Sequence, residues 1–216
     1  HLLAKADTKE VQEVVTLLNQ LVLKFKARIH AHISQLVAPL TAAIFAHVRA
    51  LDAAIASSSS AAVSARGPQS DDVRERRGLL RSYFSFLHSL VHNELTVVLS
   101  EPHNSAHFGE ALQVLQRGTL EGPDLNLQRQ CVVILQRLVE LWGGGQDARF
   151  DEYIVKELVP AGFQVFSQPH FELADAAAGP LLDAVLALQK ARPRPRLRPP
   201  TRPAARRRRS PSTPST

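Results

Sequence analysis

The chain has 216 residues, of which 44% are apolar, and its single cysteine, Cys131, excludes a disulfide framework and favours a reducing compartment. No apolar run approaches the roughly 20 residues of a membrane span, and the N-terminus has no signal pattern. Nine arginines follow Lys190, and without them 17 basic residues (26 − 9) face 20 acidic ones, so the net charge of +6 belongs to a basic tail. The chain begins at His1 and lacks methionine, which predicts a piece of a longer protein.

Two amphipathic helices are predicted in the first fifty residues. The first spans residues 8–29, with Thr8 as its N-cap and apolar residues at three- and four-residue steps. The second spans residues 33–51, and Pro39 is expected to kink it or to delay its start. Residues 53–70 are rich in alanine and serine and are interpreted as a linker, because they bury too little apolar area to offset their ordering entropy.

A third helix is predicted to begin at Asp71 or Asp72. It is apolar on two faces, as expected for a helix packed between neighbours on both sides. Residues 95–99 are interpreted as its continuation or as a short helix, and residues 108–115 as its partner helix. The next residues are expected to interrupt the helices and then to begin a new one, namely Gly118, Gly122, Pro123 and Asp124.

Residues 128–163 are predicted to form a helical hairpin. The glycines at 143–145 end the first helix, where glycine favours a left-handed turn, and Asp147 is expected to cap the second. A last helix is predicted over residues 171–188, interrupted by Gly179 and Pro180. From Ala191 onward proline, arginine, serine and threonine predict a disordered or polyproline-like tail.

The spacing of the predicted hairpins indicates a repeat. Asp71 and Asp124, where two of them begin, are 53 positions apart (124 − 71), including a long connection. Without that connection the hairpins approach the roughly 40–47-residue period of HEAT and armadillo arrays. The predicted fold is therefore all-α: an α-solenoid of HEAT-like helical hairpins over residues 1–190, with a disordered basic tail over residues 191–216.

The residues favour a protein that is not an enzyme and has no cofactor. The glycine run at 143–145 follows a helix, whereas a phosphate-binding loop follows a strand. His88 and His92 are spaced to reach one metal ion, but no third ligand is in register, so surface or groove histidines are the favoured interpretation. Cys131 lies on an apolar helix face and is expected to be a buried small residue, because a nucleophilic thiol needs an exposed electropositive setting.

Two features of the third helix have competing interpretations. Tyr83, Phe84 and Phe86 have the chemistry of a base-stacking platform, but they lie in the densest apolar stripe and are assigned to the core. An exposed basic cluster near them is interpreted as an ion-pair face in preference to a phosphate-binding one (Arg74, Arg76, Arg77, Arg81, with Asp71, Asp72 and Glu75 nearby). In the tail, Arg206–Arg209 are open to nonspecific phosphate binding, to nuclear targeting or to no selected role.

Four segments of the chain resemble the C-terminal region of the exportin-T family of tRNA export receptors. They are RSYFSFL at residues 81–87, ILQRLVELWGG at 134–144, IVKELVPAGF at 154–163 and FELADA at 171–176. LLAKADTKEVQEVVTLLNQLVLKFK at residues 2–26 is also similar to the segment upstream in that family. The order is kept over about residues 2–190, and the run LVELWGG is the most specific part of the resemblance.

The resemblance implies a HEAT-repeat member of the importin-β superfamily without enzymatic activity. Such a receptor binds tRNA together with Ran-GTP, passes nuclear pore components and shuttles between nucleus and cytoplasm without inserting into a membrane. Ran binding in the family rests largely on N-terminal repeats, so this chain is not expected to complete transport alone. The chain departs from the family at Gly145, where a lysine is expected, in the linker at 53–70, and after residue 188, where the family continues with further helices.

The first hypothesis is a part of an export receptor that contributes to a tRNA-binding surface. Its candidate tRNA contacts are basic residues of the predicted helices, selected for their charge alone, namely Arg74, Arg77, Arg81, Arg129, Arg137 and Lys156. Arg206, Arg207, Arg208 and Arg209 form the nonspecific basic tail. The alternative is a helical-repeat scaffold that binds proteins and uses the tail for nuclear targeting. An enzyme that uses His88, His92 or Cys131 ranks below both.

Overall fold

The computed structural model describes residues 6–61, 71–121, 124–143 and 148–191. All regular secondary structure in these ranges is helical, which confirms the all-α prediction. The elements in chain order are α1 (Thr8–Phe25), η1 (Lys26–Ile29), α2 (His30–Ala61), α3 (Asp71–His92), α4 (Val97–Ser100), α5 (Ser105–Leu120), α6 (Leu125–Trp142), α7 (Ala148–Tyr153), η2 (Ile154–Leu158), α8 (Val159–Gln164), η3 (Val165–Ser167) and α9 (Ala178–Lys190).

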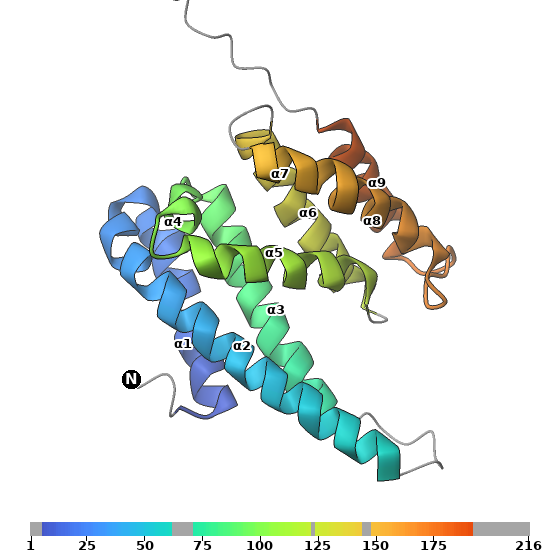
Figure 1. Cartoon of the computed structure of the whole chain (residues 1–216), viewed down its shortest axis with the longest axis horizontal. Coiled ribbons are helices and arrows are strands. Elements are labelled where there is room, and N and C mark those ends of the chain that lie inside the picture. Colours follow the sequence, from blue (N-terminus) through green and yellow to red (C-terminus); the bar gives the residue numbers. More distant parts are fainter. Residues whose placement is uncertain (1–5, 62–70, 122–123, 144–147, 192–216) are drawn as a thin grey trace, which may run out of the picture.

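The helices stack in two layers, with each layer following chain order (Figure 1). In the first layer α1 packs on α3, α3 on α6, and α6 on α9. In the second layer α2 contacts α5, and α5 contacts α8. Each second-layer helix also contacts the first-layer helix of the following hairpin, as in the pairs α2 with α3, α5 with α6, and α8 with α9. Contacts that join only neighbouring repeats define an α-solenoid and confirm that prediction.

The first-layer helices α3, α6 and α9 begin at Asp71, Leu125 and Ala178. Successive starts are therefore 54 (125 − 71) and 53 (178 − 125) residues apart. This interval exceeds the roughly 40–47 residues of a HEAT repeat. In the first interval the longest connection, residues 93–104, lies within the hairpin between α3 and α5 and contains α4, whereas in the second it is residues 168–177, between η3 and α9.

Helix α3 is buried on two faces because it packs against α1, α2 and α6. Tyr83, Phe84 and Phe86 are each at most 1% exposed, which confirms that they belong to the core. Tyr83 meets Phe45 edge to face at 5.3 Å between ring centroids, and its hydroxyl lies 3.2 Å from that of Thr41. Burial raises the pKa of Tyr83 well above its ordinary value. These aromatic side chains are therefore unavailable to stack on nucleotide bases.

The first two helices differ from their predicted bounds. Asp7 caps α1 in place of Thr8, through a capping box with Glu10. Helix α2 begins at His30 and contains Pro39, so the delayed start is wrong. The same helix continues to Ala61, so the predicted linker is wrong for residues 53–61. Alanine has the highest helix propensity and carries the helix past the expected end. Residues 62–70 lie outside the described ranges.

The predicted break at Gly118 is wrong, because α5 continues through it to Leu120. A Cβ built on Gly118 would lie 2.7 Å from the Sγ of Cys131 and 3.2 Å from the ring of Phe84. The glycine therefore allows α5 to approach α6 and α3 closely. Asp124 caps α6 as predicted, by accepting a hydrogen bond from the Leu127 N–H at 3.1 Å. The short helix α4 confirms the second of the two interpretations of residues 95–99.

The predicted helical hairpin forms, but its turn and second arm differ in detail. Gly143 at the end of α6 has φ −67° and ψ 158°, so the expected left-handed conformation is wrong at this residue. The other predicted turn residues, Gly144, Gly145 and Asp147, lie outside the described ranges. The second arm consists of α7, the π-helical segment η2 and α8, in which Pro160 lies in the first turn.

The last predicted helix, over residues 171–188, starts too early. The structure places turns over residues 168–177 and begins α9 at Ala178, with Gly179 and Pro180 in its first turn, where proline is tolerated. The Nε2 atom of Gln128, a buried residue of α6, lies 2.8 Å from the Nε2 atom of His170. This contact holds the turn segment against α6. The tail from residue 192 lies outside the described ranges.

One helical stretch, within Thr8–Ser57, is long and apolar enough to cross a membrane by length and composition alone. The sequence expectation considered only uninterrupted apolar runs and missed it. Core helices of soluble proteins meet the same criterion, and α2 buries Ile33, Leu40 and Ile44 completely. Packing against α1 and α3 therefore explains its apolar face.

Candidate nucleic-acid interface

The arginines of α3 lie on its solvent-facing side, and three of them pair with carboxylates. Arg74 pairs with Asp71 one turn earlier on the same helix. Arg81 reaches across to α6 and donates to the Asp124 carboxylate at 2.5 Å. Arg76, which is part of the same cluster, donates to Asp52 of α2 at 2.5 Å. The structure confirms an ion-pair face, although two of its pairs join different helices, which local spacing does not reveal.

A groove of about 550 Å³ lies between α3 and α6 and brings Arg81 and Arg129 together. We call it the α3–α6 groove. Its lining also includes hydrogen-bonding side chains of both helices, namely Ser85, His88, Asn126 and Gln130. The Nε2 atom of Gln130 donates to the Ser85 hydroxyl at 3.2 Å. Arginines and neutral donors in one concave surface are the groups that bind phosphate oxygens in protein–nucleic acid complexes.

Asp124 is the carboxylate that lines the α3–α6 groove. Burial alone would raise its pKa, but the Leu127 N–H and the guanidinium groups of Arg81 and Arg77 together lower it. The residue is therefore ionised at neutral pH and offsets one positive charge. Arg129 is exposed on α6 and forms no ion pair with any of the described residues. It supplies the uncompensated positive charge of the groove.

His88 also lines the α3–α6 groove, and its ring stacks on that of His92 at 4.0 Å between centroids. The Nδ1 atom of His92 lies 2.9 Å from the His88 carbonyl oxygen. Burial, followed by repulsion from His92, lowers the pKa of His88. Among the described residues no group of three or more His, Cys, Asp or Glu side chains has an arrangement that would hold a metal ion. The two histidines are therefore groove and surface residues.

The other candidates are dispersed. Arg77 lines a second groove of about 610 Å³ between α2, α3 and α5, where four arginines face four carboxylates. Arg137 donates to Glu140 at 3.0 Å on α6, and Lys156 donates to Glu152 at 2.5 Å beside α7. Arg206–Arg209 lie outside the described ranges. The structure thus places two of the predicted contacts, Arg81 and Arg129, in the lining of one groove, while Arg77 lines the second groove but still acts on Asp124.

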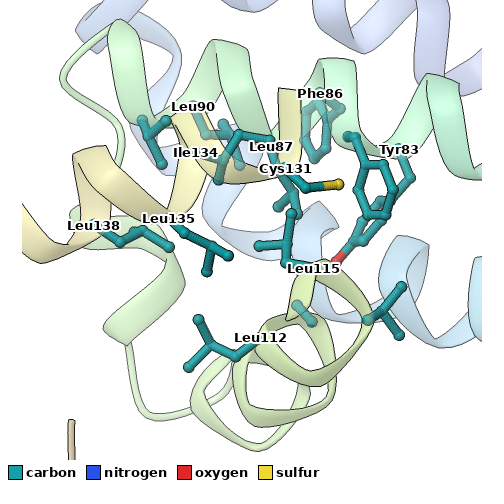
Figure 2. Close-up of a cluster of buried hydrophobic side chains, with 14 of the residues drawn as sticks. Tyr83, Phe86, Leu87, Leu90, Leu112, Leu115, Cys131, Ile134, Leu135 and Leu138 are labelled. Carbon is teal, nitrogen blue, oxygen red and sulfur yellow. The ribbon is translucent and has the colours of Figure 1, made fainter. Parts of the chain in front are cut away.

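Cys131 lies among apolar side chains of α3, α5 and α6 (Figure 2). It is fully buried, and burial raises the pKa of its thiol far above the ordinary value. The thiol is therefore protonated and shielded from solvent. This confirms the expectation of a buried small residue and removes it as a nucleophile.

Sequence reasoning missed a group of cations at the junction of α1 and α2. Lys24, Lys26 and Arg28 were considered only as charges near the end of a helix, yet all three are exposed. The signal was an alternating basic run, KFKAR at residues 24–28, which also contains an aromatic residue. It was not assigned to RNA because cations are expected at the C-terminal end of any helix.

Comparison with known proteins assigns the fold to a family. A family model described as Exportin-T matches residues 1–192. The chain is 33% identical over 177 residues to Exportin-T of Homo sapiens and to that of Pongo abelii, covering 82% of this chain and 17% of each relative. It is 28% identical over 165 residues to Exportin-T of Arabidopsis thaliana, covering 76% of this chain and 15% of the relative. The chain thus spans about a sixth of the length of these relatives.

Proposed function

The chain belongs to the exportin-T family, and from this we infer that it is part of a nuclear export receptor. We propose that the receptor binds tRNA together with Ran-GTP and carries it from nucleus to cytoplasm past nuclear pore components. The match over residues 1–192, which takes in the whole described solenoid, is the observation that carries this proposal. The proposed work consists of binding and release, so it requires no catalytic group in this chain.

A helical solenoid suits a structured RNA as its partner. The narrow major groove of an RNA duplex prevents side chains from reading its bases, so duplex RNA is recognised through its shape, its phosphates and its 2′-hydroxyls. The α3–α6 groove offers Arg81, Arg129 and neutral hydrogen-bond donors to such a backbone. We propose it as the principal tRNA contact of the described residues.

The remaining candidates have a smaller proposed role. Arg74, Arg137 and Lys156 each pair with a carboxylate on their own or an adjoining helical segment. RNA would have to compete with these ion pairs. Arg77 lies in the groove of balanced charge, and Arg206–Arg209 are proposed to add nonspecific attraction.

The proposal is tested by titrating labelled tRNA into the full chain, with and without Ran-GTP. An unstructured RNA of equal length serves as the competitor. We expect tRNA to bind more tightly than the competitor, and Ran-GTP to leave binding unchanged or to strengthen it. Equal binding of both RNAs would remove the case for tRNA recognition by this chain. Absence of binding to either RNA would leave the protein-binding scaffold as the better hypothesis.

A further inference from the structure

The junction of α1 and α2 carries an exposed aromatic ring between exposed cations. We define the α1–α2 corner as Lys24, Phe25, Lys26 and Arg28, which span the last turn of α1 and the start of η1. The three cations are exposed, and Phe25 is 42% exposed. Figure 1 places this corner at the opposite end of the array from α9. None of its four residues lines the α3–α6 groove.

Most of the predicted RNA contacts form ion pairs with carboxylates, and the cations of the corner differ from them in this respect. None of Lys24, Lys26 and Arg28 forms an ion pair within the part of the chain that the structure describes. The carboxylate of Glu101, which directly follows α4, contacts the start of α2: His30 lies 3.0 Å from it and the Ser34 hydroxyl donates to it, while His103 lies at 3.6 Å. The corner therefore keeps its full positive charge for a ligand.

The backbone holds the corner in an uncommon conformation. Lys26 has φ 49°, which side chains other than glycine rarely adopt, and its N–H donates to the Val22 carbonyl at the end of α1. The chain then enters the 3₁₀ turn η1. The Lys24 ammonium lies 5.6 Å from the Phe25 ring centroid, and Lys26 and Arg28 follow within three residues of that ring in the chain.

We propose that the α1–α2 corner binds a single-stranded stretch of RNA. The three cations contact successive phosphates, and a base stacks on the Phe25 ring. Positive charge beside exposed aromatic side chains is the combination by which proteins bind unpaired nucleotides. The inference rests on the proposed function, because it gives the tRNA receptor a contact for an unpaired segment of its cargo.

An anionic membrane surface is the other partner with this charge preference, and the packing of α1 disfavours it. The apolar face of α1, with Val11, Val15 and Val22, is fully buried in the core. The large apolar residues that α1 leaves exposed are Leu17, Leu23 and Phe25, which are too few for an interfacial helix that inserts a whole face. The dipole of α1 favours cations here, but it does not account for an exposed aromatic residue among them.

The test measures the affinity of the full chain for a labelled unstructured RNA over a range of salt concentrations. All proteins carry Arg206→Gln, Arg207→Gln, Arg208→Gln and Arg209→Gln, so that the tail does not dominate binding. The corner variant is Lys24→Gln, Lys26→Gly and Arg28→Gln, in which glycine suits the positive φ of position 26. We expect the slope of log affinity against log salt to fall by about 2, or roughly 0.7 for each lost phosphate contact.

A matched control removes three exposed cations elsewhere through Lys9→Gln, Arg117→Gln and Lys190→Gln. We expect it to retain most of the slope. A second variant, Phe25→Leu, keeps the charge and should weaken binding at least about five-fold through lost stacking. Equal losses in the corner and control variants, or no effect of Phe25→Leu, would overturn the proposal.

Two further probes separate this proposal from its alternatives. Vesicles containing phosphatidylserine test the membrane surface, and dependence on the corner for vesicles but not for RNA contradicts the proposal. Labelled tRNA, titrated in parallel, tests the proposed function. Binding of unstructured RNA through the corner without preference for tRNA would sustain the corner and reject the receptor function. Failure of the tail-neutralised chain to bind unstructured RNA rejects the corner.

Discussion

Gly118 allows α5 to approach both α3 and α6 closely. We expect Gly118→Ala to lower the free energy of unfolding by roughly 1–3 kcal/mol, because its Cβ would lie 2.7 Å from the Cys131 sulfur. Gly109→Ala is the matched control on the same helix, where nothing lies within 4 Å of the added atom. It should gain about 0.5–1 kcal/mol from helix propensity. Urea denaturation of both variants measures these effects, and a stabilised Gly118→Ala would exclude the close approach.

Asp124 makes a pH-dependent contribution to stability. Its lowered pKa means that the contribution is complete above the ordinary value of about 3.8 and is lost as the pH falls through the lower folded value. We expect Asp124→Asn to lower the free energy of unfolding by roughly 1 kcal/mol at neutral pH, because asparagine keeps the cap but loses the charge that Arg81 contacts. Denaturation measured between about pH 2.5 and pH 7 should show the free energies of unfolding of the two proteins converging in acid. A difference in stability that stays constant with pH would show that the charge of Asp124 does not contribute to stability.

Arg129 and Arg137 lie on the same helix and differ in their partners. We expect Arg129→Gln to weaken tRNA binding roughly two- to five-fold, because its charge has no ion-pair partner among the described residues. Arg137→Gln removes a charge that Glu140 already offsets and should have a smaller effect. Fluorescence anisotropy at low salt compares them. The reverse order would place the tRNA contact away from the α3–α6 groove.

The sequence allowed the burial of individual residues to be predicted, but not the ion pairs that join residues distant in the chain. The burial of Tyr83 and Cys131 follows from their apolar stripes, because a helix face is set by spacing. The contact of Arg81 with Asp124 joins residues 43 positions apart, and it depends on how α3 and α6 pack. The same limit explains why six basic candidates reduced to two that share a groove. Charge is visible in a sequence, but the carboxylate that offsets it is not.

The turn after α3 places a glutamate, Glu94, in a backbone conformation that favours glycine. Leu95 N–H donates to the Leu90 carbonyl at 3.1 Å, which closes a Schellman turn around Glu94 at φ 64°. Glycine normally occupies that position, so Glu94→Gly should raise the free energy of unfolding by up to about 1 kcal/mol. Glu94→Ala removes the charge but keeps the strain. Thermal unfolding of both variants distinguishes the causes, and equal stabilisation would assign the effect to charge.

The centres of the helices were predictable, and their ends often were not. Three- and four-residue periodicity marks a buried face, so the cores of α1, α3 and α6 lie where the pattern placed them. The end of α2 was misjudged because an alanine-rich segment has high helix propensity without an apolar stripe. The segment at 168–177 was misjudged in the opposite direction. There the contact between His170 and Gln128 is available only after α6 is in place.

At the scale of the whole molecule, the sequence predicted the helical repeat, and its resemblance to a family was the more specific prediction. The interval between Asp71 and Asp124 predicted a repeating hairpin, and the two-layer stacking confirms it (Figure 1). Periodicity alone predicts an α-solenoid but neither its family nor its function, because solenoids share a core pattern and differ in their surfaces. The match to Exportin-T adds the family, and the surface grooves add candidate contacts within it.

The central claim is that the folded repeats recognise tRNA, while the basic tail adds only general attraction. The most direct measurement is the salt dependence of tRNA affinity for the full chain and for its Arg206–Arg209→Gln variant, each against an unstructured RNA of equal length. Neutralising the tail should shift affinity for both RNAs alike and leave the preference for tRNA, with a salt-sensitive component that Arg129→Gln reduces. Loss of both the preference and the salt dependence on neutralising the tail would contradict the claim.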